Sequence, residues 1–68
     1  MDTDLAQESL RIVYTNYRGE TAERNIRPLK IWYGSTEFHP SAQWLLQAID
    51  LDKQAERDFA MKDISAWL

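Results

Sequence analysis

Apolar and polar side chains alternate along residues 10–15, and the segment is rich in β-branched and aromatic residues, which is typical of a strand. One face of this segment carries Leu10, Ile12 and Tyr14. The short polar gap after it begins with Asn and ends with Gly19, a pattern that predicts a hairpin turn with a positive φ at the glycine. We therefore expect a second strand to return through residues 21–33.

The apolar face changes within this second strand. Ile26 sets one face before Pro28. After the proline the apolar positions take the other parity, at Leu29, Ile31 and Tyr33. Proline has no N–H to donate to a ladder and forces the residue before it into extended geometry. The pattern predicts a bulge or sharp bend at Pro28, of the kind that lets a strand turn a corner in a small barrel.

Two later segments, residues 43–49 and 53–68, fit more than one secondary structure. As a strand, the first would place Trp44, Leu46 and Ala48 on one face, but its alanine, leucine and glutamine content favours a helix. The second also has apolar residues near helical spacing. Local propensity alone therefore predicts a hairpin followed by two helices.

The remaining segments are polar. Residues 34–41 have the composition of a loop, from which we expect Phe38 to fold back onto the core. Residues 1–9 show no alternation and are expected to form a tail or a short helix. The 68-residue chain is 44% hydrophobic, which is enough for one small domain, placed here at residues 10–68.

Charge is unevenly distributed over a chain whose net charge is −3. Residues 11–30 hold five basic and two acidic side chains, whereas the segments on either side are acidic. The basic segment is either a solvated strand surface or a docking face for an anion. Without an apolar run of the roughly 20 residues that cross a bilayer, and with an acidic N-terminus unlike a signal peptide, the expected location is the cytoplasm.

Catalytic constellations are missing from the sequence. His39 is the single histidine, there is no cysteine, and two glycines cannot build a phosphate-binding loop. The acidic pair Asp50 and Asp52, like Glu37 with His39, lacks a third ligand at metal-site spacing. We therefore expect a protein that is not an enzyme and holds no metal or cofactor.

An ordered set of residues resembles the WYL domain, a bacterial module named for a Trp-Tyr-Leu triplet. The resemblance covers residues 10–67, nearly the whole chain. It is carried by Tyr14, Gly19, Arg24-x-Ile26-x-Pro28-Leu29, Gln43-Trp44-Leu45-Leu46-x-Ala48, Arg57-x-Phe59 and Lys62-Asp63-Ile64.

The resemblance implies an all-β fold, a small SH3-like or Sm-like five-stranded barrel with a bent second strand. It turns both ambiguous segments into strands, joined by a turn in which Gln54 takes a mildly strained conformation. It makes residues 61–63 a single 3₁₀ turn before a short last strand. The implied core consists of Ile12, Ile26, Trp44, Leu46, Phe59 and Ile64.

The resemblance also implies a function, because WYL domains act as sensor domains of bacterial transcription regulators and are thought to bind an anionic ligand, often a piece of nucleic acid. Carried over residue by residue, Tyr14, Arg24 and Arg57 match the ligand-binding pattern, and Arg27 joins them from the basic segment. Three positions depart from the pattern: Leu45 replaces the tyrosine of the triplet, Leu29 a common histidine, and Asp63 a common arginine. We therefore expect weak, strongly salt-dependent binding of a nucleotide or oligonucleotide.

An interaction module is the alternative. A small barrel can dock a partner protein by pairing at an edge strand or through an aromatic groove. The apolar run Ile31-Trp32-Tyr33 is the candidate surface, with Phe38 beside it. Neither function needs a membrane.

Overall fold

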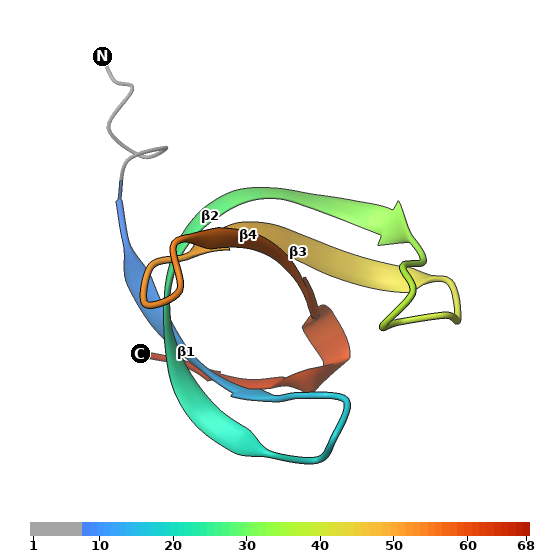
Figure 1. Cartoon of the computed structure of the whole chain (residues 1–68), viewed down its shortest axis with the longest axis horizontal. Helices are drawn as coiled ribbons and strands as arrows, with labels where there is room; N and C mark the ends of the chain where they lie inside the picture. The colour runs from blue at the N-terminus through green and yellow to red at the C-terminus, as the bar shows by residue number, and fades with distance from the viewer. Residues whose placement is uncertain (1–7) are drawn as a thin grey trace.

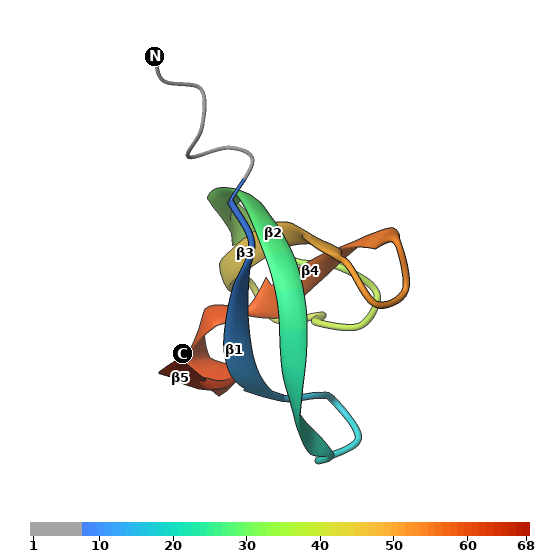
Figure 2. The ribbon, with the colours of Figure 1, turned by 90° about the vertical axis from the view of Figure 1, so that its left-hand side faces the viewer.

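The computed structural model describes residues 8–68 as one curved antiparallel sheet in the order β4-β3-β2-β1-β5. Figures 1 and 2 show the strands curling around a common centre. The elements are β1 (Leu10–Thr15), β2 (Thr21–Gly34), β3 (Gln43–Asp50), β4 (Ala55–Ala60), the 3₁₀ turn η2 (Met61–Asp63) and β5 (Ile64–Trp67). The predicted all-β class, with five strands and a 3₁₀ turn before the last, is confirmed.

The predicted hairpin of β1 and β2 is confirmed, and its register runs from Leu10 opposite Ile26 to Thr15 opposite Thr21. Gly19 has a φ of +81°, as the turn requires. A single side chain organises this turn, because Asn16 Oδ1 accepts the backbone N–H groups of residues 18 and 20 at 2.9 and 3.0 Å.

The predicted break in β2 is a register shift. Pro28 lies opposite Ala48, but Lys30 lies opposite Gln47, so the intervening Leu29 has no partner in β3. The first half of β2 pairs with β1 and the second half with β3. The bulge therefore lies near the point where the long strand changes partners, and it helps the sheet to curve.

Residues 43–50 and 55–60 are strands, so the expectation of two helices from local propensity is wrong. Leu46 on β3 lies opposite Phe59 on β4, and both side chains are buried. Burial against neighbouring strands outweighs the helix preference, which amounts to only a few tenths of a kcal/mol for each such residue. The connecting turn has Gln54 at a φ of +53°, as expected.

Six buried residues form the core on the concave side of the sheet, with Leu10, Met61 and Ile64 packed against them. Ile12, Ile26, Leu46 and Phe59 are confirmed as core, joined by Tyr14 and Ala48. Two expectations are wrong, because Trp44 is 57% exposed and Phe38 is 56% exposed. Trp44 lies at the start of β3 opposite Tyr33, beyond the strands that cover the core.

The two edge strands of the sheet, β4 and β5, are linked through η2 and share no ladder within the described residues. A side chain bridges part of this gap. Ala60 on β4 donates its N–H to the hydroxyl of Tyr14 on β1 at 3.1 Å, across 46 positions of sequence. The tyrosine thus ties an inner strand of the sheet to the edge strand β4.

Replacing Phe59 by alanine should lower the free energy of unfolding by about 3–5 kcal/mol, because it empties the centre of the core. A domain of this size has a total stability in that range, so the variant should be largely unfolded. Phe38→Ala is the matched control, and its exposed ring should cost less than about 1 kcal/mol. Urea denaturation followed by tryptophan fluorescence measures both, and a cooperative, near-wild-type transition for Phe59→Ala would contradict the assignment.

Candidate functional site

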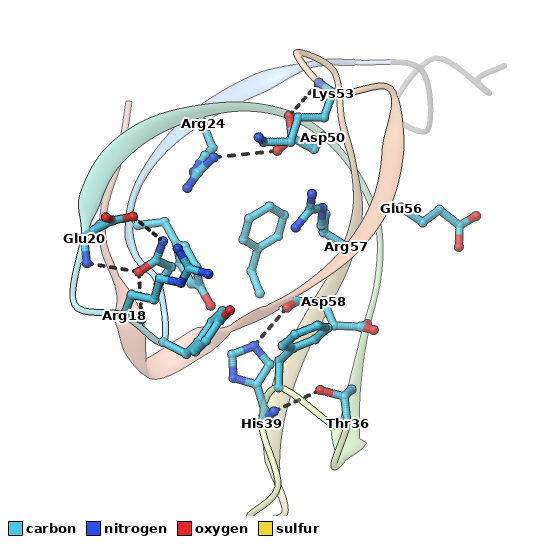
Figure 3. Close-up of a pocket in the computed structure, with 15 residues that line it drawn as sticks. Arg18, Glu20, Arg24, Thr36, His39, Asp50, Lys53, Glu56, Arg57 and Asp58 are labelled. Atoms are coloured by element: carbon cyan, nitrogen blue, oxygen red, sulfur yellow. Dashed lines mark hydrogen bonds and ion pairs between the residues drawn. The ribbon is translucent and has the colours of Figure 1, made fainter.

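A pocket of about 550 Å³ opens on the concave side of the sheet, which is the volume of an ordinary small-molecule site. Its wall comes from β1, β2, the ends of β3 and β4, and the loops after β1 and β2 (Figure 3). Tyr14 and Phe59 belong both to the core and to the lining of the pocket. The lining side chains are Tyr14, Asn16, Tyr17, Arg18, Glu20, Arg24, Thr36, Phe38, His39, Asp50, Lys53, Glu56, Arg57, Asp58 and Phe59.

Arg24 is held at the edge of the pocket by a buried carboxylate. Its guanidinium Nη1 lies 4.0 Å from Oδ2 of Asp50, which is 2% exposed. The other carboxylate oxygen accepts the backbone N–H groups of Asp52 and Lys53 at 3.1 and 3.2 Å. The Asp50 side chain therefore connects the β3–β4 turn to Arg24, and these bonds offset part of its desolvation cost.

Arg57 comes from β4 and points toward the centre of the pocket, whereas its neighbour Glu56 points away (Figure 3). No salt bridge joins Arg57 or Lys53 to an acidic residue within residues 8–68. A guanidinium offers several N–H donors in a rigid plane that matches phosphate or carboxylate. Arg57 is thus free to act as a bidentate donor from β4.

Tyr14 lines the same pocket as these arginines and is 4% exposed. Its ring meets Phe59 edge-on, with centroids 4.9 Å apart and an interplanar angle of 86°. Burial raises the pKa of the Tyr14 phenol, Asp63 adds to the rise, and the Ala60 N–H and Arg24 oppose it. The phenol is therefore protonated at neutral pH, so it can donate a hydrogen bond while accepting one from Ala60.

The charges around the pocket balance. Four basic and four acidic residues contribute to the pocket lining, although the Glu56 side chain points away from its centre. Three of the acids have structural partners. Asp50 pairs with Arg24 and accepts N–H groups of the β3–β4 turn, and Glu20 Oε1 accepts the Asn16 side-chain amide at 3.2 Å. Asp58 Oδ1 accepts the indole N–H of Trp32 at 2.9 Å. The site is consequently less cationic than a dedicated phosphate site, which limits the affinity for an anion.

Three of the four predicted ligand-binding residues come together here. Tyr14, Arg24 and Arg57 line the same pocket. Arg27 is not part of the lining, because it lies one position beyond Ile26 on the other face of β2, opposite Ile49. The alternation along residues 21–26 gives the reason, since positions 24 and 26 share a face that position 27 does not.

The predicted partner surface is divided between the two faces of β2. Ile31 and Tyr33 are 55% and 58% exposed. Tyr33 also meets the exposed Trp44 ring, with centroids 5.3 Å apart. Trp32 is half-buried on the opposite face, where it bonds to Asp58. The exposed apolar surface is therefore formed by Leu29, Ile31, Tyr33 and Trp44.

Several lining residues were not predicted as site residues. Asp50 was considered only as a metal-ligand pair with Asp52, although strand alternation from Leu46 and Ala48 would have placed it on the inner face. Lys53 reaches the pocket from the β3–β4 turn, and no pattern in the neighbouring residues identifies it as a site residue. The same is true of Tyr17 and His39, whose approach to the site depends on how two loops meet.

In comparisons with known proteins, no family model, no curated protein and no solved structure matches this chain. Within residues 8–68 no helix is long and apolar enough to cross a membrane. The same residues contain no group of three or more histidine or acidic side chains that could hold a metal ion.

Replacing Tyr14 by phenylalanine should lower the free energy of unfolding by about 1–3 kcal/mol at neutral pH, because it leaves the Ala60 N–H without its partner. The pH dependence has a definite sign. The folded state keeps the phenol protonated to higher pH than the unfolded chain does, so the wild type loses stability as the pH rises above about 10.

Denaturant unfolding at neutral and alkaline pH measures both effects, with Tyr33→Phe as the control on an exposed ring. Tyr14→Phe should lose less stability between the two conditions than the wild type does. If the free energy of unfolding falls by the same amount at alkaline pH in the variant and in the wild type, groups other than Tyr14 cause the loss.

Proposed function

We propose that this protein is a non-catalytic regulatory module that binds an anionic ligand, a nucleotide or oligonucleotide, in the manner of a WYL sensor domain. One observation carries the proposal. Tyr14, Arg24 and Arg57, the three residues that matched the ligand-binding pattern, come from three different strands and line one pocket. The sequence separation among them makes their meeting an independent support for the resemblance.

The proposal includes the SH3-like or Sm-like barrel as the architecture of the domain. The meander of four strands, the 3₁₀ turn and the return of β5 to β1 support it. So does the Tyr14 bond to Ala60, which joins β1 to the far edge of the sheet. In this frame the pocket lies inside the curve of the sheet, with Phe59 in its lining.

Affinity for the anion is weak and depends on salt. The acidic residues around the pocket and the net charge of −3 oppose an anion. Attraction from Arg24, Arg57 and Lys53 acts over the Debye length, which is about 10 Å at 0.1 M salt. Binding is thus visible at low salt and greatly weakened near physiological salt.

The proposed role is sensing rather than catalysis, and the proposed location is the cytoplasm. His39, the one histidine, lines the pocket with Nε2 at 3.2 Å from the backbone oxygen of Asp58. That contact holds the imidazole against the edge of β4 and occupies one ring nitrogen with a structural partner.

Arg57→Ala should weaken binding of a single-stranded oligonucleotide of about five nucleotides and reduce the slope of log affinity against log salt by about 0.7 for each lost phosphate contact. Arg27→Ala is the matched control, since it removes the same charge outside the pocket. Fluorescence anisotropy at several salt concentrations measures the slopes. Equal slopes for the two variants would show that only net charge matters and would contradict the site.

An interaction module is the second candidate, and the free edge of β2 favours it. Residues 28–34 pair with β3 on one side, and within the described chain they have no partner strand on the other. Exposed Ile31 and Tyr33 flank this edge. An extended peptide with alternating apolar side chains could add there as a strand. Titration with a peptide of alternating valine and threonine would shift the amide resonances of residues 28–34 and leave the pocket unchanged.

A further inference from the structure

The ribbon formed by β2 and β3 extends past β4 and carries exposed apolar side chains. β4 pairs with β3 only from Leu45 onward, so Trp44 and Tyr33, which lie opposite each other, are beyond the third strand. Ile31 lies opposite Leu46, a residue of the buried core, yet Ile31 itself is exposed. Side chains of directly opposite residues lie on the same face of a sheet. An apolar row therefore runs from the core to the free edge of β2 and ends there in the open.

This free edge is complementary to itself. Leu29, Ile31 and Tyr33 are all exposed and follow one another at intervals of two residues. If two copies of the segment pair antiparallel about a two-fold axis at Ile31, each Leu29 lies opposite Tyr33 of the second copy and the two Ile31 side chains lie opposite each other. Such apolar pairs stabilise antiparallel strands. Moving the axis by one residue would set Lys30 opposite Lys30, or Leu29 opposite Ser35, so the sequence favours the axis at Ile31.

The charge on this edge is compatible with self-pairing. Lys30 is the one charged residue of the segment 28–34. With the axis at Ile31, it lies opposite Trp32 of the second copy. The Trp32 indole is half-buried, and its N–H donates to Asp58 Oδ1 at 2.9 Å, so the ring is held in place with a carboxylate beside it. A lysine beside the face of a tryptophan gains a cation–π attraction. The cation of each copy thus meets an aromatic ring and a carboxylate of the other, although both chains are acidic overall.

The exposed apolar area suits a weak, reversible dimer. An aromatic side chain has roughly 150–250 Å² to bury, and Tyr33 and Trp44 are each more than half exposed. With Leu29 and Ile31 added, each copy offers apolar surface on the order of a few hundred Å², below the roughly 800 Å² per partner of a standard stable interface. Backbone hydrogen bonds along the paired edges add to the attraction. The dissociation constant should therefore lie between about 10 µM and 1 mM.

We propose that a second copy of this chain binds at the free edge of β2 and forms a two-fold dimer through residues 29–33. The two sheets then join edge to edge, and their apolar rows meet at Ile31. This inference rests on the second candidate function, docking at the edge of β2, and names the partner. None of residues 29–33 lines the pocket, so the pocket of each copy stays open in the dimer. A partner that binds only the folded chain also stabilises so small a domain.

Sedimentation velocity from about 10 µM to about 1 mM protein tests the association. The apparent mass of the wild type should rise toward twice that of the monomer. Ile31→Lys sets two lysines opposite each other, so this variant should stay monomeric throughout, with an unchanged circular dichroism spectrum. Leu68→Lys makes the matched change at an exposed apolar residue on the other side of the sheet and should dimerise like the wild type. A wild type that stays monomeric at the highest concentration, or equal dimerisation of the two variants, overturns the proposal.

Cysteine cross-linking tests the register on a chain that contains no cysteine of its own. In the proposed dimer the two copies of residue 31 lie directly opposite each other, with Cα atoms about 4.5–5.5 Å apart, which is within reach of a disulfide. Ile31→Cys should therefore form a covalent dimer when it is oxidised with diamide. Leu29→Cys is the matched control, because the two copies of residue 29 are offset by roughly 13 Å along the strands. It should not link to itself but should link to Tyr33→Cys when the two variants are mixed.

The cross-linking result also separates self-pairing from docking of other partners. If Leu29→Cys links to itself as readily as Ile31→Cys does, the two-fold pairing at Ile31 is overturned. If neither variant forms a dimer while the alternating valine and threonine peptide still shifts residues 28–34, self-pairing is overturned and docking at the edge stands.

Discussion

The hydrogen bond from the Ala60 N–H to the Tyr14 hydroxyl ties the edge strand β4 to the inner strand β1, two strands that are not neighbours in the sheet. Its donor lies on an edge strand, where a backbone N–H would otherwise face water or another chain. Its acceptor lies on a core side chain packed against Phe59. A single aromatic residue thus adds a direct link between β1 and β4 to the ladders and the core that already connect them, in a small domain with no cysteine.

The pocket depends on the same constraint. Arg57 is carried by β4, and Arg24 by β2, which pairs with β1, so the Tyr14 bond links the two parts of the sheet that supply these arginines. Asp50 adds a second link by joining Arg24 to the β3–β4 turn. A buried carboxylate that positions one arginine also reduces the charge available to a ligand. The site therefore combines a defined geometry with a modest electrostatic attraction.

Much of the first half of the fold could be predicted from the sequence. Alternation revealed β1, Gly19 revealed the turn, and the change of parity after Pro28 revealed the bulge. These features are local, so they are recorded in neighbouring residues. The strands β3 and β4 could not be predicted in the same way, because their local propensity is helical and only contacts with distant strands decide their structure.

The site residues divide in the same way, into those that the sequence indicates and those that depend on contacts between distant segments. Family resemblance and strand position brought together Tyr14, Arg24 and Arg57, but the charge pattern alone could not distinguish Arg24 from Arg27, which face opposite sides of β2. The resemblance placed Trp44 in the core, yet the side chain is exposed and its ring meets Tyr33 instead. The contact between the rings of Tyr17 and Phe38, whose centroids are 5.5 Å apart, depends on the meeting of two loops, for which a single sequence contains no signal.

A chemical-shift titration of isotope-labelled protein tests the central claim most directly. The probe is a single-stranded oligonucleotide of about five nucleotides, added at low salt to the wild-type chain. The account predicts that the largest shifts occur at the backbone amides and side-chain Nε–H groups of Arg24 and Arg57 and at the amide of Tyr14, with little change at Arg27. Saturating oligonucleotide that moves none of these resonances, or that moves only those of Ile31 and Tyr33, would contradict it.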